Sequence, residues 1–211
     1  MMAVNKSHDT DSCLMCSIEP VFRHRPRNVQ QSNDTRRVIR LGAMRTPRLV
    51  ADDLVLEAPD VGDAEDWSDA QDGECARWFG WPCRPGVERC RTHLERVAND
   101  AEPDSFTWAI RAPAGFAGGI DLKLHDGRWN VSYFVHPAHR GRGIATRALR
   151  LVCGWAFDGL GLDVVSTRVR AGNAASLRVL AKTGFRPAGE ETGDDGHVEV
   201  LHELTGSTHR V

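Results

Sequence analysis

The feature that most constrains this chain of 211 residues is a glycine-rich turn between a strand-like and a helix-like segment. The turn, His139–Thr146, reads His-Arg-Gly-Arg-Gly-Ile-Ala-Thr and follows the strand-like run Val131–Val135. An amphipathic helical pattern begins directly after it and continues to about Phe157. Such a turn presents unpaired backbone N–H groups at the positive end of a helix dipole, which favours phosphate binding. Its glycines allow close approach, and Arg140 and Arg142 add charge that suits a pyrophosphate.

Length and composition favour one domain in the cytoplasm. A net charge of -2 argues against a general nucleic-acid binder. No apolar run approaches the roughly 18 residues of a membrane span, and the charged segment Met1–Pro20 is unlike a signal peptide. The six cysteines are expected to be free thiols. Because no second cysteine pair accompanies Cys13 and Cys16, we expect no metal site.

The chain is predicted to have three parts. Residues 1–48 are polar and basic without a clear period, which indicates a flexible, disordered extension. Residues 49–206 form the folded domain, and residues 207–211 form a C-terminal tail. Met44 is a candidate natural start, because folded-looking sequence begins just after it.

Periodicity and turn residues predict a mixed sheet with helices on its faces, hence an α/β or α+β domain. The expected strands are Leu54–Glu57, Phe106–Ile110, Phe116–Leu124, Trp129–Val135, Val164–Val169, Phe185–Gly189 and His197–Leu204. The expected helices are Val61–Gln71, Gly73–Phe79, Val87–Val97, Ile144–Phe157 and Ala174–Lys182.

This order of elements and two motifs resemble the GNAT acetyltransferase superfamily. Arg140–Ala145 fits its acetyl-CoA motif, (Arg/Gln)-x-x-Gly-x-(Gly/Ala), at the strand-to-helix boundary. Asn173–Ser176, followed by Leu180–Phe185, is similar to the Asn-x-x-Ser and Gly-Phe signature of the ribosomal-protein alanine N-acetyltransferase branch. The resemblance covers about Leu54–Leu204. It implies a mixed, mostly antiparallel sheet flanked by helices, with acetyl-CoA as the acyl donor.

The resemblance also implies a role for each motif. Phe134 and Val135 would pair their backbone with the pantetheine amides, and a bulge in this strand would aim an N–H at the thioester oxygen. Asn173 and Ser176 would face the pantetheine and the sulfur, although Asn173 also suits a helix N-cap. The residues expected to hold the CoA pyrophosphate are Arg140, Gly141, Arg142, Gly143, Ile144 and Ala145.

For the departing thiolate, the resemblance offers an incomplete answer. Many GNAT enzymes protonate it with a tyrosine in the helix before the Gly-Phe turn, where this chain has Leu180. Ser176 is therefore the candidate for hydrogen bonding the sulfur or passing on a proton. Tyr133, the only tyrosine in the chain, is expected to be a half-buried strand residue.

The base that removes the amine proton is expected to be a carboxylate. Glu190 or Glu191 matches an acidic position used in this branch, and Glu191 is taken as the candidate. The branch often has a glutamate at the position of Asn130, which weakens the prediction of a base in that strand. His136 and His139 are expected to be solvated surface residues.

Acidic residues suggest where the acceptor amine would bind. An acidic cluster lies where family members fold two helices over the acceptor pocket, and it would either attract a cationic amine or form solvated helix faces. Trp78, Phe79 and Trp81 would line this pocket or fill the core. The acidic residues are Asp60, Asp63, Glu65, Asp66, Asp69, Asp72 and Glu74.

Three functions are compatible with these patterns. The leading hypothesis is an acetyl-CoA-dependent N-acetyltransferase that acts on the α-amine of a protein or peptide. The alternatives are acetylation of a small amine, such as an antibiotic, polyamine or metabolite, and a catalytically weak acyl-CoA-binding module. The acidic helices and the tryptophans would permit a homodimer.

Overall fold

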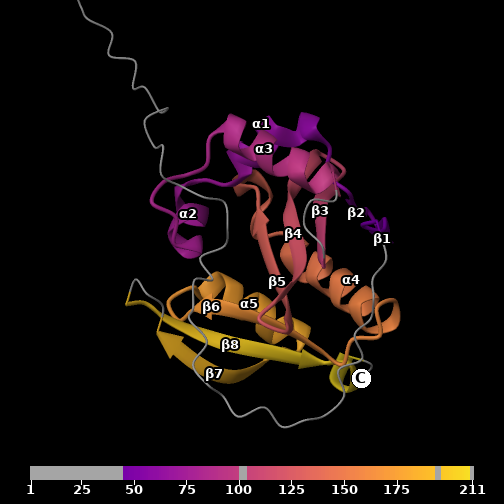
Figure 1. Cartoon of the computed structure of the whole chain (residues 1–211), viewed down its shortest axis with the longest axis vertical. Coiled ribbons are helices and arrows are strands. Elements are labelled where there is room, and N and C mark those ends of the chain that lie inside the picture. Colours follow the sequence, from indigo (N-terminus) through magenta and orange to yellow (C-terminus); the bar gives the residue numbers. More distant parts are fainter. Residues whose placement is uncertain (1–44, 100–103, 193–195, 210–211) are drawn as a thin grey trace, which may run out of the picture.

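One eight-stranded sheet organises the part of the chain that the computed structural model describes, residues 45–99, 104–192 and 196–209 (Figure 1). Most of the predicted extension 1–48 lies outside these residues. The strands are β1 Leu49–Ala51, β2 Leu54–Glu57, β3 Ser105–Ala112, β4 Gly115–His125, β5 Arg128–Val135, β6 Val164–Arg170, β7 Arg186–Thr192 and β8 Val198–Thr205. The helices are α1 Ala64–Ala70, α2 Gly73–Phe79, α3 Val87–Ala98, α4 Ile144–Asp158, α5 Ala174–Thr183 and α6 Gly206–His209, with 3-10 turns at Val61–Asp63 and Pro137–His139.

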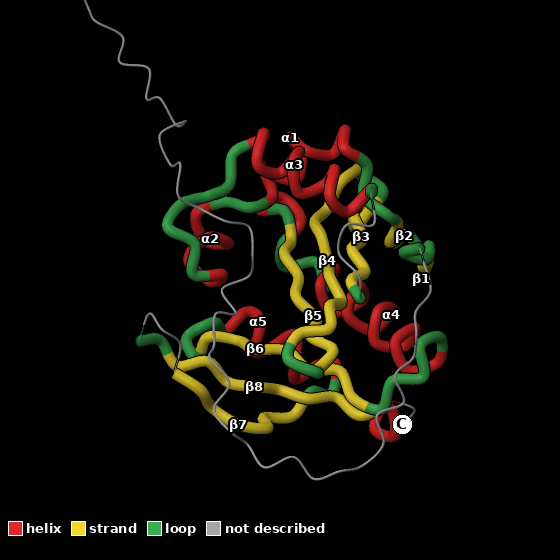
Figure 2. The backbone as a smooth tube through the Cα atoms, in the orientation of Figure 1, coloured by secondary structure: helices red, strands yellow, loops and turns green. Residues whose placement is uncertain are grey.

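The sheet has the order β1-β2-β3-β4-β5-β6-β8-β7. Every neighbouring pair is antiparallel except β5 and β6, which are parallel. This confirms the predicted mixed, mostly antiparallel sheet. Figure 2 shows helices on both sides of it.

The predicted boundaries differ from the structure at several elements, and β1 and α6 were not predicted. Two of the differences lie beside buried residues. The helix predicted over residues 61–71 is a 3-10 turn followed by α1. The Asp60 carboxylate accepts from the Gly62 N–H at 2.7 Å, and the Asp63 carboxylate accepts from the Asp60 N–H at 2.9 Å. This reciprocal cap fixes a tight first turn before α1 begins. Phe185, predicted to start a strand, is a buried core residue before β7, at 3% exposure.

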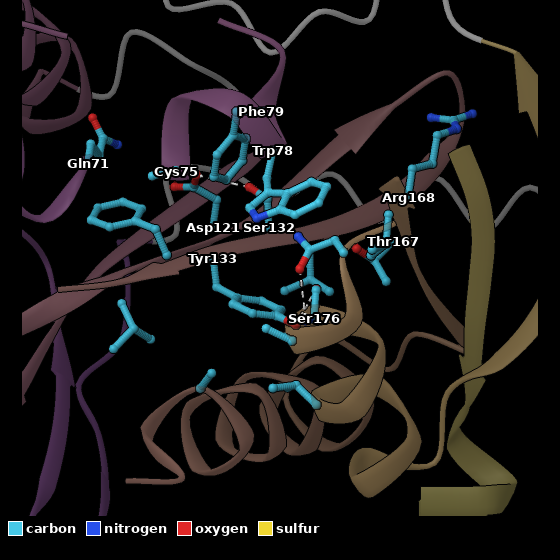
Figure 3. Close-up of a pocket in the computed structure, with 18 of the residues that line it drawn as sticks. Gln71, Cys75, Trp78, Phe79, Asp121, Ser132, Tyr133, Thr167, Arg168 and Ser176 are labelled. Carbon is cyan, nitrogen blue, oxygen red and sulfur yellow. Dashed lines mark hydrogen bonds between the residues drawn. The ribbon is translucent and has the colours of Figure 1, made fainter. Parts of the chain in front are cut away.

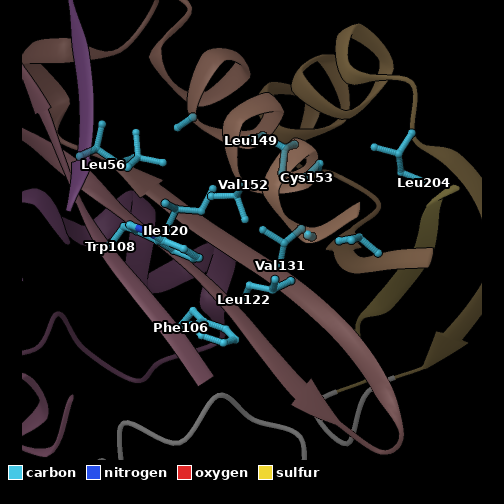
Figure 4. Packing of buried hydrophobic residues seen from close by; sticks show 14 of the residues in the cluster. Leu56, Phe106, Trp108, Ile120, Leu122, Val131, Leu149, Val152, Cys153 and Leu204 are labelled. Carbon is cyan, nitrogen blue, oxygen red and sulfur yellow. The ribbon is translucent and has the colours of Figure 1, made fainter. Parts of the chain in front are cut away.

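Each face of the sheet has its own hydrophobic core. The larger core packs the β2–β6 strands against α4, with Leu149, Val152 and Cys153 fully buried (Figure 4). The smaller core packs the other face against α1 and α3 and includes Trp67 and Phe134. Because side chains of a strand alternate between faces, β5 contributes to both cores.

The parallel pair β5 and β6 holds together at a single register position, Asn130 opposite Ser166. Beyond it the two strands run apart (Figures 1 and 2). Within the described part of the chain, the far half of β5 therefore has β4 as its one strand partner. No helix among the described residues is long and apolar enough to cross a membrane.

Candidate active site

A cavity of about 550 Å³ lies where β5 and β6 part. Its walls come from α1, α2, α3, β4, β5, β6, β8, α5 and the glycine turn before α4. The volume is that of a typical small-molecule site. Figure 3 shows Asp121 and Ser132 on one side of β5 and the Tyr133–Ser176 pair on the other.

The glycine turn forms one end of this cavity, as the motif predicts. Gly141 and Gly143 have φ angles of +77° and +75°, the left-handed region that glycine adopts without strain. A Cβ on either would meet nothing within 4 Å, so the space beside both is open. Gly143 is the N-cap of α4 and provides no side-chain acceptor, which leaves the first helical N–H groups to a ligand. Ile144 and Ala145 also line the cavity.

The two arginines of the turn differ in their surroundings, because Arg140 is already paired. Arg140 donates from both terminal nitrogens to the Asp72 carboxylate, at 2.8 and 2.9 Å, and to Glu74 at 2.9 Å. Its Nε donates to the Val135 carbonyl at 3.1 Å. Arg142 is exposed and outside the cavity lining. The positive charge of Arg140, which was expected to bind the CoA pyrophosphate, thus holds α2 against the turn.

Asp72 joins this ion pair to the start of α2. Its carboxylate accepts from the Cys75 N–H at 2.9 Å and caps the helix. The hydrogen bond from Arg140 is the main reason that the pKa of Asp72 is lowered. At the other end of α2, the Trp78 ring lies 3.7 Å from the place that a Cβ on Gly172 would occupy. Helix α2 therefore contacts both the glycine turn and the loop before α5.

Beyond Asn130, the edge of β5 that faces the opening pairs with no strand of the described residues, and the Val135 carbonyl on it accepts a side-chain hydrogen bond from Arg140. The register with β4 is unbroken from Gly118–Val135 to His125–Arg128, and the His136 N–H donates to the Ala117 carbonyl at 2.9 Å. Backbone groups alternate along an antiparallel strand, so Phe134 also faces β4, whereas Tyr133 and Val135 face the opening.

Two expectations for β5 change in consequence. The expected bulge does not interrupt its pairing with β4, because the register shift lies between β3 and β4, at Ile110/Arg111. The free edge belongs to Tyr133 and Val135, and Phe134 instead buries its ring against Trp67, at a centroid distance of 5.1 Å.

At the start of α5, the structure joins Ser176 to a residue that we expected to be an ordinary strand aromatic. The Asn173 side chain accepts from the Ser176 N–H at 3.1 Å, the N-cap role considered above. The hydroxyls of Ser176 and Tyr133 are 2.8 Å apart and hydrogen bonded. Burial raises the pKa of Tyr133 to about 12, so its hydroxyl stays protonated. Leu180 is a core residue, at 1% exposure.

Glu191 is not brought to Ser176. It is exposed on β7, and its carboxylate lies 3.4 Å from Arg168 Nε. Neither Glu190 nor Glu191 lines the cavity. By contrast His139, expected on the surface, is 8% exposed and lines the cavity. Burial is the main cause that lowers the pKa of His139, followed by the charges of His136 and Arg142.

Most residues of the predicted acidic cluster form ion pairs. Asp63 is buried and accepts from Arg111 at 2.8 Å, and Asp69 accepts from Arg84 at 3.1 Å. Of the predicted acidic residues, only Glu74 lines the cavity, where Arg140 binds it. These carboxylates therefore position α1 and α2. The aromatic residues Trp78, Phe79 and Trp81 do line the cavity.

A carboxylate missed by the sequence analysis lies deeper in the cavity. Asp121 stands on β4 opposite Ser132 of β5, and Ser132 Oγ donates to its Oδ2 at 3.3 Å. Its Oδ1 is buried and has no hydrogen-bond partner among the described residues. The sequence signal that could have indicated Asp121 is a charged residue directly after the run 116–120, which is buried in the structure. In the described ranges, no group of three or more His, Cys, Asp or Glu side chains could hold a metal ion.

Comparison with known proteins decides the family. Residues 53–186 match the acetyltransferase (GNAT) domain. The chain belongs to the GNAT acetyltransferase family. It is an acyltransferase that uses acetyl-CoA.

Its relatives are more varied than the predicted branch. The probable N-acetyltransferase YjcK of Bacillus subtilis is 44% identical over 59 residues, and the match covers 28% of this chain and 33% of YjcK. Mycobacterium smegmatis RimJ in complex with CoA-disulfide has a TM-score of 0.63 at 23% identity, over 77% of this chain and 87% of that one. Spermidine N-acetyltransferase of Vibrio cholerae, in complex with CoA and spermine, has a TM-score of 0.66 at 13% identity, and the match covers 75% of this chain and 99% of that one. These likenesses show the fold, which several GNAT branches share.

The link between α2 and the glycine turn predicts how this GNAT domain responds to Asp72→Asn. Asparagine keeps the helix cap but removes the charge that binds Arg140. Amide hydrogen exchange in α2 should become roughly twofold to fivefold faster, because partly exposed ion pairs contribute about 0.2–1 kcal/mol. Asp69→Asn, which removes the pair with Arg84, is the matched control and should leave α2 unchanged. Equal exchange in all three proteins would contradict the link.

Proposed function

We propose that this GNAT enzyme acetylates the primary amine of a peptide or protein N-terminus. One observation carries the proposal. The same cavity holds an open phosphate-type turn, an unpaired strand edge and a hydroxyl pair at one end. At the other end it holds buried polar atoms that have no partner among the described residues. The first set suits the acyl donor, and the second suits an acceptor with both hydrogen-bond donors and acceptors.

The donor end accommodates CoA in three steps. The N–H groups from Gly141 to Ala145 bind the pyrophosphate at the start of α4, where the helix dipole favours negative charge. The pantetheine amides pair with the backbone of Tyr133 and with the N–H of Val135, whose carbonyl is held by Arg140, in an added-strand mode of binding. The thioester then lies near Asn173 and Ser176, which line the cavity at the start of α5.

Ser176 stabilises the sulfur as it leaves. The amine nitrogen attacks the thioester carbonyl carbon, and the carbon–sulfur bond breaks with its electron pair on sulfur. The Ser176 hydroxyl donates a hydrogen bond to this thiolate, while Tyr133 donates to Ser176 Oγ. A donor that itself accepts a hydrogen bond is strengthened. The raised pKa of Tyr133 keeps the proton that this arrangement needs.

The acceptor end favours a peptide over a polyamine. The Trp81 indole Nε1 is a buried donor without a partner among the described residues. Asn130 Oδ1, in a residue that is 7% exposed, is likewise buried without a partner among the described residues. A peptide has a carbonyl for the indole and an N–H group for the Asn130 oxygen. A charged polyamine only donates, so it would leave the indole unpaired at a cost of about 1–3 kcal/mol.

The acceptor class is tested by thiol release from acetyl-CoA. We expect the highest kcat/KM with peptides that have a free N-terminus, and no release with the same peptides N-terminally blocked. Spermidine and an aminoglycoside serve as small-amine competitors. Faster release with either would assign the enzyme to small amines. Binding of CoA without release on any amine would indicate an acyl-CoA-binding module.

Placement of CoA is tested by Gly143→Glu. The substitution adds bulk and negative charge where the pyrophosphate binds, so CoA affinity measured by calorimetry should fall by at least about 100-fold, or about 2.7 kcal/mol. Gly127→Glu is the matched control, because Gly127 also has a φ of +75° with open space around it and lies outside the cavity lining. Both variants have the same backbone strain. Near-normal CoA affinity in Gly143→Glu would refute the placement.

The hydroxyl pair is tested by a double-mutant cycle. Ser176→Ala should lower kcat on the order of 100-fold, and Tyr133→Phe less, with CoA affinity unchanged. Because Tyr133 acts through Ser176, the double variant should be no slower than Ser176→Ala alone. Losses that multiply would show that the two hydroxyls act separately.

A further inference from the structure

We infer that Asp121 is the catalytic carboxylate that binds the acceptor amine and takes up its proton during attack on the thioester. The inference rests on the proposed acetylation of an amine in this cavity, and it replaces Glu191 as the base. It is carried by the position of one side chain within the sheet and by the state of its two oxygens.

The pleat of β4 aims Asp121 away from the main core. Its neighbours Ile120 and Leu122 are fully buried and pack with α4 on one face of the sheet. Because side chains alternate along a strand, Asp121 lies on the other face, toward α1 and α2. There it lines the cavity, on the same side as Trp78 and Phe79 (Figure 3).

The two oxygens of Asp121 have different environments. Ser132, directly opposite on β5, donates to Oδ2 at 3.3 Å and fixes the orientation of the carboxylate. Oδ1 is buried with no partner among the described residues. A buried carboxylate oxygen is costly unless it accepts a hydrogen bond, so this atom points to a ligand that donates one. A primary amine is such a ligand.

Asp121 is also correctly placed relative to the donor. Ser132 and Tyr133 are consecutive residues of β5, so their side chains lie on opposite faces. Ser132 meets Asp121 on the acceptor face, and Tyr133 meets Ser176 on the face of α5. The free edge of β5 at Tyr133 lies between the two pairs. An amine bound at Asp121 and a thioester held near Ser176 therefore meet at the opening between β5 and β6.

The chemical step then balances within the site. The amine nitrogen forms a bond to the carbonyl carbon, and its N–H proton passes to Asp121 Oδ1. The carbon–sulfur bond breaks, and the thiolate leaves toward Ser176. The products are an amide, CoA thiolate and a protonated Asp121, which returns its proton to solvent or to the departing thiolate.

Other titratable side chains also line the cavity. Glu74 is held by Arg140, and the thiols of Cys75 and Cys90 have pKa values raised mainly by burial, so they stay neutral. The groups that line the cavity from α2, α3, β4 and β6 are Glu74, Cys75, Cys90, His93, Lys123, His125, Arg168 and Arg170.

The test compares Asp121→Asn, Asp121→Glu and wild type with a free peptide N-terminus as acceptor. At neutral pH, Asp121→Asn should lower kcat/KM by 100-fold or more, with unchanged CoA affinity, because general-base catalysis contributes about 10²–10⁴-fold. The deficit should shrink at higher pH, where the amine is neutral in solution. Asp121→Glu keeps a carboxylate and should retain more activity. Asp66→Asn, the same change at an exposed site on α1, should match wild type.

The outcomes separate the two proposals. A wild-type enzyme that releases thiol, with Asp121→Asn within threefold of it, overturns the role of Asp121 and leaves the proposed function standing. Equal losses in Asp121→Asn and Asp121→Glu, with both variants folded and binding CoA, overturn it too. If Asp121→Asn fails to fold, Asp121→Glu decides, since activity below one hundredth of wild type with no pH-dependent recovery contradicts a base. A wild type inactive on every amine overturns both proposals.

Discussion

The parting of β5 from β6 after one register position is the constraint on which the site depends. A sheet that stayed closed would pair the backbone of Tyr133 and Val135 with β6 and leave no opening. Because it opens, the N–H and C=O groups of one strand edge need partners from elsewhere. Arg140 satisfies one of them, the Val135 carbonyl. The remaining groups face the cavity, next to the starts of two helices, α4 and α5.

Local features of this arrangement could be predicted from the sequence, because they depend on neighbouring residues. The turn His139–Thr146 and the cap Asn173 are defined within a few positions of the chain, and both stand where the patterns placed them. The mixed sheet followed from periodicity in the same way. The predicted boundary of an element was wrong where a side-chain hydrogen bond determines where that element begins, as the Asp60 cap does before α1.

The site residues that were missed or misjudged depend on contacts across the chain. Arg140 binds Asp72, 68 positions away, and Tyr133 binds Ser176, 43 positions away. No local pattern shows that a guanidinium in a phosphate-type motif is already paired, or that a strand tyrosine reaches a helix start. Asp121 was overlooked for a related reason. Its significance depends on which face of β4 it occupies and on one oxygen having no partner in the described part of the chain. Both are properties of the assembled sheet.

The pairing of Arg140 also explains how a helix as short as α2 is held in place. Helix α2 has seven residues, too few to be stable alone. It persists because Asp72 caps its start, Gly80 ends it at a φ of +72°, and Arg140 binds it to the glycine turn. The same guanidinium holds the end of β5 through the Val135 carbonyl. Helix α2, the glycine turn and the end of β5 are thus fixed to one rigid planar group. In the proposed function, this link sets the distance between amine and thioester before either substrate binds.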